Sequence, residues 1–563
     1  MDEGLYLNNN LAIINFDLTY PSSTKELLNS PCFKEFTKRY MLHLKEEDLN
    51  LYKWLLKGDS IHDAIYEILK TFRLLLVVSP DEFDNYYLKD KNLLLKFVEG
   101  FHDYWMSYRR FSVTKTRFNR KTETHFVLRD SYFNRRLRSF YRDIEQCLIG
   151  EKNNVYRQLN TGTNASLLVY QLENFFLSDK YGDLYGIPII ESVMIRTPMI
   201  ISTNSNKREG AFEEANQNPI LEFDGDENSW FGYPAKVGNL FFMIYFHRDF
   251  IYNGVSLANL FELASPKVAH SKPDGILLFG NRNQAKNLFY YDEEEDLWIG
   301  TVGYDVKSEY FGYMKKMILT LYNLKVMNMG WLPIHGSFVN VYLKNDGKKG
   351  LLLVGDSGAG KSESIEALKN LENDIVKQVE VIFDDMGSLH VEDGIPYAQG
   401  TEIGAFIRLD DLSPGTPYEN MDRSIFFNPD KNNARLIIKT TNYNVISKNH
   451  EIDLLCYLNN YDDKKGMYEF EDLEKGKKVF ISGKRMSKGT TQEVGFSETY
   501  FANPFGPMQK KELCDELIDK IFKSLKAKGV YIGEIYTQLG LNKKDEDPLN
   551  TVAEELLKFL QME

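Results

Sequence analysis

The sequence predicts a mixed α/β (α+β) protein with a helical N-terminal region and a later region built on a mixed sheet. Between Ser23 and Gly150, apolar residues recur at spacings of three and four, which is typical of amphipathic helices. After Gly150, short apolar runs are bounded by Gly, Pro or Asn and favour strands. Residues 350–371 combine a strand pattern, a glycine-rich turn and a helix pattern. We therefore predict three regions: helical 1–150, an α/β region 151–300, and a loop-bearing catalytic domain 301–563.

Individual elements follow from these patterns in chain order. The helix-like spacing is clearest in residues 25–44 and 61–78. The strand-like runs are GIPIIESVMI at 186–195, NLFFMIYF at 239–246, DGILLFG at 274–280 and GLLLVG at 350–355. The polar stretch Thr203 to Asn218 is predicted to be a loop.

Size and charge restrict the class of protein. A chain of 563 residues with 43% hydrophobic and 26% charged residues is expected to form two or three globular domains. A net charge of -13 disfavours nucleic acid as a partner of the whole molecule, because a polyanion is repelled at long range. The basic, aromatic stretch from Arg109 to Arg142 is either a polyanion site, a solvated helical face, or an interface with acidic residues such as Asp292 to Asp296.

The cysteines and the hydropathy pattern predict a cytoplasmic protein. The four cysteines are scattered, without a CxxC pair, so neither a disulfide framework nor a zinc site is indicated. The N-terminus lacks a basic segment followed by an apolar stretch, and no run approaches the roughly 18 apolar residues that span a bilayer. We therefore expect no membrane partner.

The segment GDSGAGKSE is a candidate phosphate loop for ATP. Its glycines allow the backbone to wrap a phosphate chain at a helix N-terminus, while the lysine neutralises the outer phosphates. The serine after the lysine is expected to place its hydroxyl on a Mg²⁺ or Mn²⁺ ion that bridges them. The nucleotide-binding candidates are Gly355, Asp356, Ser357, Gly358, Ala359, Gly360, Lys361, Ser362 and Glu363.

Two adjacent aspartates follow the next strand pattern, VEVIFDD. Asp384 and Asp385 are predicted to lie at the end of that strand, where sheets commonly present ligands. One carboxylate would hold the metal, and the other would orient or deprotonate the attacking hydroxyl. A pair of turn or helix-capping aspartates is the structural alternative.

The C-terminal half resembles two related families. IHGSFVNVYLKNDGKKGLLLVGDSGAGKSE is similar to HPr kinase/phosphorylases, with a His-Gly, a strand and a loop that ends in Lys-Ser-Glu. YFGYMKKMILTLYNLKVMNMGWLPIH is similar to the ATP-type phosphoenolpyruvate carboxykinases, with paired lysines, an Asn-containing helix, a Pro and a His. The resemblance covers about residues 300 to 540 and implies a P-loop phosphotransferase with a carboxykinase-like fold.

The carboxykinase resemblance implies a manganese site. Its ligands would be Lys316, His335 and Asp385, and the lysine and histidine have the carboxykinase separation, 335 − 316 = 19 positions. A lysine ligates a metal only when neutral, so burial and the dication must lower its pKa. The alternative is a solvent-facing lysine pair and a core histidine.

The match weakens beyond this set. AFIRLDDL and KGTTQEVGFSETYFANPFGP resemble the segments after the metal aspartate and beside the adenine, and NNARLIIKT implies that Arg435 bridges the γ-phosphate and the substrate. The Thr-Gly-Arg-Ser-Pro-Lys-Asp segment that carries the carboxylate-binding arginine has no counterpart. Arg196 and Arg208 are candidate substitutes, and ordinary surface arginines are the alternative.

Three functions are consistent with these residues. The first is a carboxykinase-type reaction, in which oxaloacetate and ATP give phosphoenolpyruvate, carbon dioxide and ADP. The second is a kinase for a protein or small-molecule hydroxyl, with Asp384 or His335 as base. The third is an ATP-regulated binding module in which the helical region engages a partner. The first two expect Lys361, His335, both aspartates and Arg435 to be catalytic.

Overall fold

The computed structural model is a mixed α/β protein that divides into two compact units. One unit comprises Met1–Glu173, Gly186–Met199 and Asp226–Phe231, and the other comprises Asn174–Tyr185, Ile200–Gly225 and Gly232–Glu563. The structure describes residues 4–16, 21–116, 123–172, 176–223, 225–356, 358–370, 374–409, 421–429, 433–488, 494–541 and 548–561. The predicted division into regions 1–150, 151–300 and 301–563 stays a prediction.

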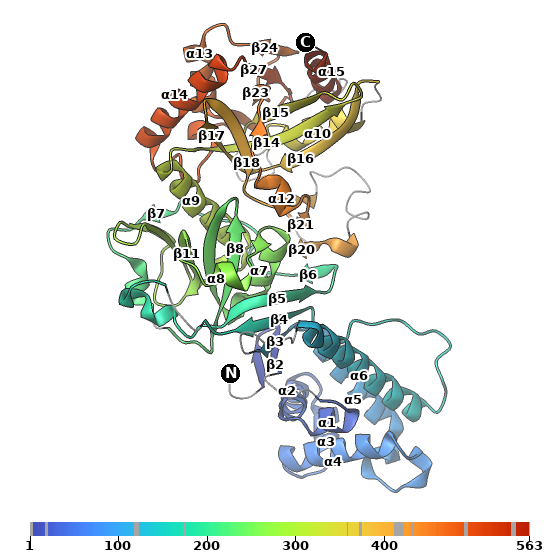
Figure 1. The fold of residues 1–563 in the computed structure, drawn as a ribbon. Coiled ribbons are helices and arrows are strands. Elements are labelled where there is room, and N and C mark those ends of the chain that lie inside the picture. Colours follow the sequence, from blue (N-terminus) through green and yellow to red (C-terminus); the bar gives the residue numbers. More distant parts are fainter. Residues whose placement is uncertain are drawn as a thin grey trace. The chain divides into compact units, whose positions relative to one another are not determined.

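The first unit is dominated by capped amphipathic helices (Figure 1). Each of α1 to α4 begins after a Ser or Asp whose side chain accepts a hydrogen bond from a backbone N–H of the first turn: Ser23, Ser30, Asp48 and Ser60. The apolar faces meet in one buried cluster that includes Met41, Leu55, Ile68 and Phe97. The helices are α1 Thr24–Asn29, α2 Pro31–Glu47, α3 Leu49–Leu56, α4 Ile61–Leu75, α5 Lys91–Met106 and α6 Glu123–Ile149.

The first unit also contains five strands among its described residues. They are β1 Leu5–Asn8, β2 Leu11–Asn15, β3 Arg109–Lys115, β4 Ala165–Tyr170 and β5 Ile189–Ile195, and they adjoin in that order. Three of them, β1 to β3, lie in the region that the helical spacing predicts to be helical, and β5 falls in the strand-like run predicted at 186–195. β2, β3 and β4 are parallel, with β1 and β5 antiparallel at either side. Helices α1 to α5 form the crossover from β2 to β3, and α6 forms the next one.

In the second unit, a first group of strands runs in the order β8-β9-β11-β13-β12-β7. β9, β11 and β13 are parallel and almost completely buried, so they read in the sequence as continuous apolar runs. The helix α9 Gly312–Asn328 follows and is buried along most of its length. The strands are β7 Glu213–Glu214, β8 Trp230–Val237, β9 Leu240–His247, β10 Glu262–Leu263, β11 Gly275–Asn281, β12 Leu288–Asp292 and β13 Leu297–Gly303, with short helices α7 Ile251–Ser256 and α8 Pro266–Ala269.

A second, mixed sheet of this unit carries the glycine-rich loop. Its order is β22-β18-β17-β14-β15-β23-β27-β24, and β16 also pairs with β14. The strands are β14 Leu332–Leu343, β15 Lys348–Val354, β16 Val376–Phe383, β17 Met386–Glu392, β18 Ile395–Gly400, β22 His450–Glu451, β23 Leu454–Asn459, β24 Met467–Glu469 and β27 Tyr531–Tyr536. Smaller pieces are β19 Gly404–Arg408, β20 Ile425–Phe427, β21 Arg435–Lys439, β25 Lys484–Lys488, β26 Val494–Glu498 and α12 Tyr443–Ile446.

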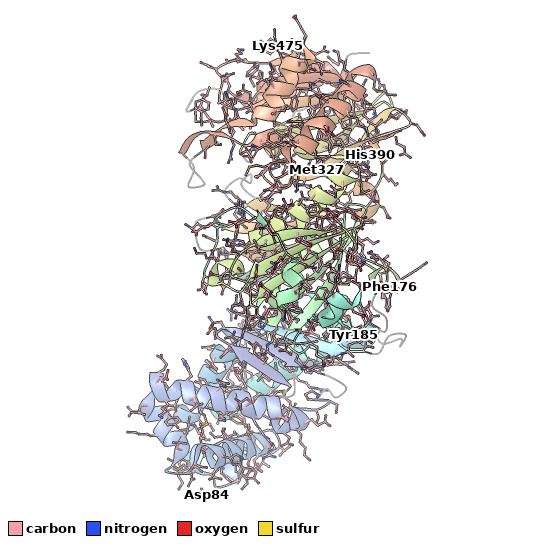
Figure 2. All side chains as sticks on the ribbon, turned by 90° about the vertical axis from the view of Figure 1, so that its left-hand side faces the viewer. Asp84, Phe176, Tyr185, Met327, His390 and Lys475 are labelled. Atoms are coloured by element: carbon pink, nitrogen blue, oxygen red, sulfur yellow. The ribbon has the colours of Figure 1, made fainter. Side chains whose placement is uncertain are left out.

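Successive side chains of β15 point to opposite faces of this sheet, and helices cover both faces. Leu351 and Leu353 pack with α10 Lys361–Asn370 and α15 Pro548–Leu560. Leu352 and Val354 pack on the other face with α13 Leu473–Ser482 and α14 Lys511–Ala527. Figure 1 shows α10 and α14 on opposite sides of β14. Figure 2 labels Met327 near the end of α9 and His390 of β17, and Met327 shares a buried cluster with Leu389.

Most of the predicted elements are confirmed, but the stretch Thr203 to Asn218, predicted to be a loop, contains the short strand β7, which pairs with β12. The helices predicted at 25–44 and 61–78 and the four predicted strands are present. Arg110 of the basic segment is buried, and its guanidinium donates to the carbonyl oxygens of five residues: Trp105, Met106, Tyr108, Asn160 and Gly162. Residues 117–122 of the segment lie outside the described residues.

The acidic partner suggested for the basic segment forms other ion pairs. Within the described ranges, the side chains at 292–296 pair with Lys180, Lys272 and Lys325, none of which belongs to 109–142. In the part of the chain that the structure describes, no helix is long and apolar enough to cross a membrane.

Candidate active site

The glycine-rich loop connects β15 to α10 in the strand-loop-helix order that its sequence predicts. Gly358 and Gly360 have φ of +80° and +108°, a backbone region that favours glycine. A Cβ on Gly360 would lie 2.8 Å from Leu539 Cδ1. Lys361 Nζ donates to Gly355 O at 2.7 Å, so the lysine side chain folds back over the loop. Ser357 lies outside the described residues.

Asp384 faces the phosphate loop. β16 ends at Phe383, and the two aspartates occupy the connection to β17. Ser362 Oγ donates to Asp384 Oδ2 at 2.8 Å, and Ser337 of β14 donates to the other carboxylate oxygen. Burial raises the pKa of Asp384, and the hydrogen bonds from Ser337 and Ser362 oppose that rise. The pair of Ser362 and Asp384 therefore lies where a cation bridging loop-bound phosphates needs oxygen ligands.

Asp385 faces a different group, the paired lysines and the histidine. Its Oδ2 lies 2.6 Å from Lys315 Nζ and 3.1 Å from Lys316 Nζ, while Oδ1 lies 3.0 Å from His335 Nε2. Burial alone would raise the pKa of Asp385, but the charges of Lys315 and Lys316 hold it well below its usual range. The three residues that the carboxykinase resemblance implies as metal ligands are thus brought together.

The hydrogen bonds of His335 define its free nitrogen. Nδ1 lies 2.7 Å from Ala502 O, so it donates to that carbonyl, and Nε2 then carries the lone pair. Burial lowers the pKa of His335, and Lys361, whose Nζ lies 3.5 Å from Nε2, lowers it further. A neutral Nε2 and a carboxylate oxygen consequently face each other at 3.0 Å, an arrangement of two acceptors that a cation between them stabilises.

The surroundings of Lys316 shift its pKa in the direction that metal ligation needs. Burial lowers the pKa of Lys316, and the neighbouring charge of Lys315 lowers it further, against the attraction of Asp385. Among the described residues, no group of three or more His, Cys, Asp or Glu could hold a metal ion. Lys316, His335 and Asp385 fit a divalent ion, whereas Ser362 belongs to the separate pair with Asp384.

Lys315 and Glu402 form a buried extension of the cluster that sequence reasoning missed. Lys315 Nζ lies 3.0 Å from Glu402 Oε1, and both side chains are almost fully buried. Burial raises the pKa of Glu402 to about 7, whereas the two carboxylates outweigh burial and raise the pKa of Lys315. The lysine doublet was the available signal, but only the fold brings Glu402 of the β18–β19 connection to it.

Residues of the β25–β26 hairpin also reach the phosphate loop. Arg485 Nε lies 3.0 Å from Asp356 Oδ2, and Thr499 Oγ1 donates to the same oxygen at 3.3 Å. Asn460 joins the two segments, since its Nδ2 donates to Gly358 O and Met486 O. The expected adenine-side segment begins at Lys488, so it includes β26 but not Arg485, and no spacing rule identifies Arg485 or Asn460.

Arg435, the predicted γ-phosphate arginine, opens β21 and lies over Phe406. Its guanidinium carbon is 5.5 Å from that ring, and Phe406 in turn contacts Phe311, which precedes α9. Within the described residues, no hydrogen bond or ion pair joins Arg435 to the lysine-histidine-aspartate cluster, and its buried Nε has no hydrogen-bond partner. Its predicted role stays a prediction.

The two candidate carboxylate arginines have different surroundings. Arg196 forms an ion pair with the buried Asp130 inside the first unit. Arg208 lies in the unit of the phosphate loop, with its guanidinium carbon 5.5 Å from the Phe505 ring. Lys316 Nζ is 4.7 Å from the same ring, and burial lowers the pKa of Arg208. Arg208 and the candidate metal lysine therefore share one aromatic neighbour.

Because no protein-family model matches the sequence and no curated protein is significantly similar to it, the site is interpreted from its own geometry. The phosphate loop, Asp384 and Asp385 form one contiguous group with Lys316 and His335. Residue types and distances are consequently the basis for any assignment.

Proposed function

We propose that this chain is an ATP- and divalent-metal-dependent phosphoryl transferase of the phosphoenolpyruvate carboxykinase type. The main support for this proposal is that two adjacent aspartates face in different directions. Asp384 contacts Ser362 of the phosphate loop, and Asp385 contacts Lys316 and His335. Neighbouring carboxylates could thus hold the phosphoryl donor and the acceptor side by side, as in-line transfer requires.

The loop residues would bind the donor. The N–H groups at the start of α10 and the positive-φ glycines point partial positive charge at the β- and γ-phosphates. Lys361, which now donates to Gly355 O, would turn to the outer phosphates, where charge develops during transfer. Arg485 neutralises Asp356, so the loop carboxylate does not repel the polyphosphate.

The second group would hold the acceptor. Lys316 Nζ, His335 Nε2 and Asp385 would bind the divalent ion, which when bound supplies positive charge beside the acceptor oxygen. Ala502 O fixes the His335 tautomer by accepting from Nδ1. Lys315, held by Asp385 and Glu402, keeps a fixed ammonium next to the acceptor.

Arg208 supports a carboxylate substrate. Arg208 and Lys316 both contact the Phe505 ring, so a guanidinium lies near the candidate acceptor site. A guanidinium is suited to bind a carboxylate through two hydrogen bonds. In the proposed reaction, the bond from C3 of oxaloacetate to its C4 carboxylate breaks and carbon dioxide leaves. The electron pair forms an enolate, whose oxygen attacks the γ-phosphorus as the bond to the ADP oxygen breaks.

The direct test is ATP-dependent conversion of oxaloacetate to phosphoenolpyruvate by the purified full-length protein with Mn²⁺ or Mg²⁺. We expect metal-dependent product that Lys361→Ala and Asp385→Asn both reduce by about a hundredfold or more. Arg208→Lys is expected to raise KM for oxaloacetate with little change in KM for ATP. The proposal is wrong if wild-type protein at high concentration forms no phosphoenolpyruvate.

A kinase for a hydroxyl acceptor is the second candidate, favoured by one observation. Burial raises the pKa of Asp384, which brings this carboxylate closer to the proton affinity that a general base needs. Incubation of the protein with γ-labelled ATP and a cell extract would then label an acceptor protein or small molecule, while oxaloacetate would be untouched. Asp384→Asn would abolish that labelling. Phosphoenolpyruvate formation without any labelled acceptor would exclude this candidate.

A further inference from the structure

The helical unit contains a cavity remote in sequence from the phosphate loop. Its volume is about 360 Å³, and residues from β1, β2, α1, α2, α5 and α6 line it. All of the lining residues belong to the first unit. The cavity is partly open to the outside, so a small molecule can reach it. Concave, mostly apolar sites of this size are typical of small-molecule binding.

The wall of the cavity is mainly aromatic. Phe33, Phe101, Phe133, Phe140 and Trp105 all line it. Several of them pack edge to face against one another, as Phe33 does with Phe140 at 5.6 Å. Ring edges and faces of this kind receive a further aromatic ring in the same geometry. An apolar cavity of about 150 Å³ accepts benzene, so this one has room for about twice that many carbon atoms.

Most polar atoms in the wall are already paired. Trp105 Nε1 donates to Thr161 O at 2.6 Å, and Tyr141 OH donates to Glu99 at 2.8 Å. Ser30 Oγ donates to Leu27 O and accepts from Phe33 N. These groups need nothing from an occupant, so they do not favour a strongly polar or charged molecule.

His102 contributes a polar group of a different kind to this wall. Its ring stacks on Tyr141 at 4.0 Å, and Nδ1 faces Asp103 Oδ1 at 3.6 Å. The buried Nε2 has no hydrogen-bond partner among the described residues. With the ring hydrogen on Nδ1, toward Asp103, Nε2 is an acceptor. Burial lowers the pKa of His102, which favours this neutral form.

We infer that this cavity binds a small aromatic molecule that carries one hydrogen-bond donor, such as a phenolic hydroxyl or an indole N–H. The rings of the wall receive the aromatic body, and His102 Nε2 accepts the hydrogen bond. A buried acceptor without a partner is costly, so an occupant that supplies the donor is preferred over a purely apolar one. This site is independent of the proposed phosphoryl transfer.

Titration calorimetry on the full-length protein tests the inference with 2-naphthol and naphthalene as matched probes. We expect saturable binding of 2-naphthol at one site per chain, with naphthalene weaker by about fivefold to tenfold. His102→Phe should remove that preference. Val98→Phe, which fills the cavity from α5, should abolish binding, whereas the same change at the exposed Val77 should leave it intact.

A crystallographic measurement does not depend on how the variants fold. Crystals of the full-length protein soaked in 4-bromophenol should show a bromine anomalous peak between the rings of Phe33, Phe101 and Phe140. No saturable heat with 2-naphthol, or a bromine peak only at another place, overturns the inference. Equal affinities of the wild-type protein for 2-naphthol and naphthalene would overturn the role of His102.

Discussion

Buried charge at the candidate site is balanced between a few side chains. Lys315 lies between Asp385 and Glu402 at 2.6 and 3.0 Å, and its side chain is 1% exposed. Removing one member of such a group leaves the remaining charges unpaired, which costs more than the group contributes as a whole. The stability of the site therefore depends on keeping the members matched.

Lys315→Met is expected to destabilise the protein by about 3 kcal/mol, because the buried Glu402 and the partly buried Asp385 lose their shared cation. Urea unfolding measures the change. The double variant Lys315→Met/Glu402→Gln removes one of the stranded charges and should recover at least about 1 kcal/mol. Additive losses in the double variant would show that the two side chains are not coupled.

Arg485 tests how the hairpin supports the phosphate loop. In Arg485→Met, the carboxylate of Asp356 keeps its charge but loses the guanidinium at 3.0 Å, so it repels incoming phosphates. We expect Kd for ATP with Mg²⁺ to rise about tenfold, or ~1.4 kcal/mol, by calorimetry. Arg485→Met/Asp356→Asn should restore most of the affinity. If the single variant binds ATP as tightly as the wild type, the hairpin does not assist the loop.

At the scale of the elements, the loop and the turns of the sheet use glycine for different reasons. Gly360 and Gly394 both have positive φ, +108° and +80°. A Cβ on Gly360 meets Leu539 at 2.8 Å, whereas a Cβ on Gly394, in the β17–β18 turn, meets nothing within 4 Å. A substitution at Gly394 therefore tests backbone strain alone, whereas a substitution at Gly360 adds a steric contact to that strain.

Gly360→Ala should weaken ATP binding, because a φ of +108° disfavours alanine and the methyl group meets the side chains of Leu539 and Thr537. Gly394→Ala is the matched control, and it should cost about 1 kcal/mol of stability from its left-handed conformation alone. Calorimetry with ATP and chemical unfolding measure the two effects. Retained ATP affinity in Gly360→Ala would contradict the geometry of the loop.

His450 links three elements and gives the fold a pH dependence. Nε2 donates to Val445 O, next to the end of α12, and Nδ1 accepts from Asn340 of β14. The contact at Nδ1 requires a neutral ring, because a protonated Nδ1 could not accept from Asn340. Burial lowers the pKa of His450 below its usual 6.5, against the hydrogen bond to Val445 O, which raises it. A depressed folded-state pKa means that the unfolded chain binds the proton more readily, so stability is present above pH 6.5 and is lost as the pH falls below it.

Between pH 7.5 and 5.5, the wild type is therefore expected to lose more stability than His450→Gln, whose amide does not titrate. Urea unfolding of both proteins across this range isolates the contribution of the histidine. Parallel pH profiles for the two proteins would mean that His450 does not titrate on unfolding.

At the scale of the whole molecule, the charge pattern bears on the choice of partners. The net charge is -13, and Arg110 of the basic segment is buried with its guanidinium on five carbonyl groups. An internal cation of this kind does not attract a polyanion. The basic segment consequently offers less exposed positive charge than its composition indicates.

We expect Kd for a fluorescent single-stranded oligonucleotide to be weaker than about 100 µM at physiological salt, measured by anisotropy. Arg135→Ala, an exposed change in the same segment, should leave both this value and the stability nearly unchanged. A micromolar Kd that weakens in Arg135→Ala would instead make the segment a nucleic-acid site.

The sequence predicted the elements that depend on local patterns. Helices at 25–44 and 61–78, the strand that ends before Asp384 and the turn from Gly355 to Lys361 are all present. Strands β1 to β3 were missed because they are short and lie among much longer helical patterns, and their pairing partners are distant in the chain.

The candidate phosphate loop is predicted by the sequence itself, since nine adjacent residues carry the glycine pattern and the lysine that are typical of such a loop. Only the tertiary structure decided how the other groups of the site meet. It turns Asp384 and Asp385 in different directions and brings Glu402 to Lys315 and Arg485 to Asp356. It also forms the cavity beside His102. The physical reason is that desolvation and ion pairing depend on which distant segments meet, and residue spacing along the chain does not specify that.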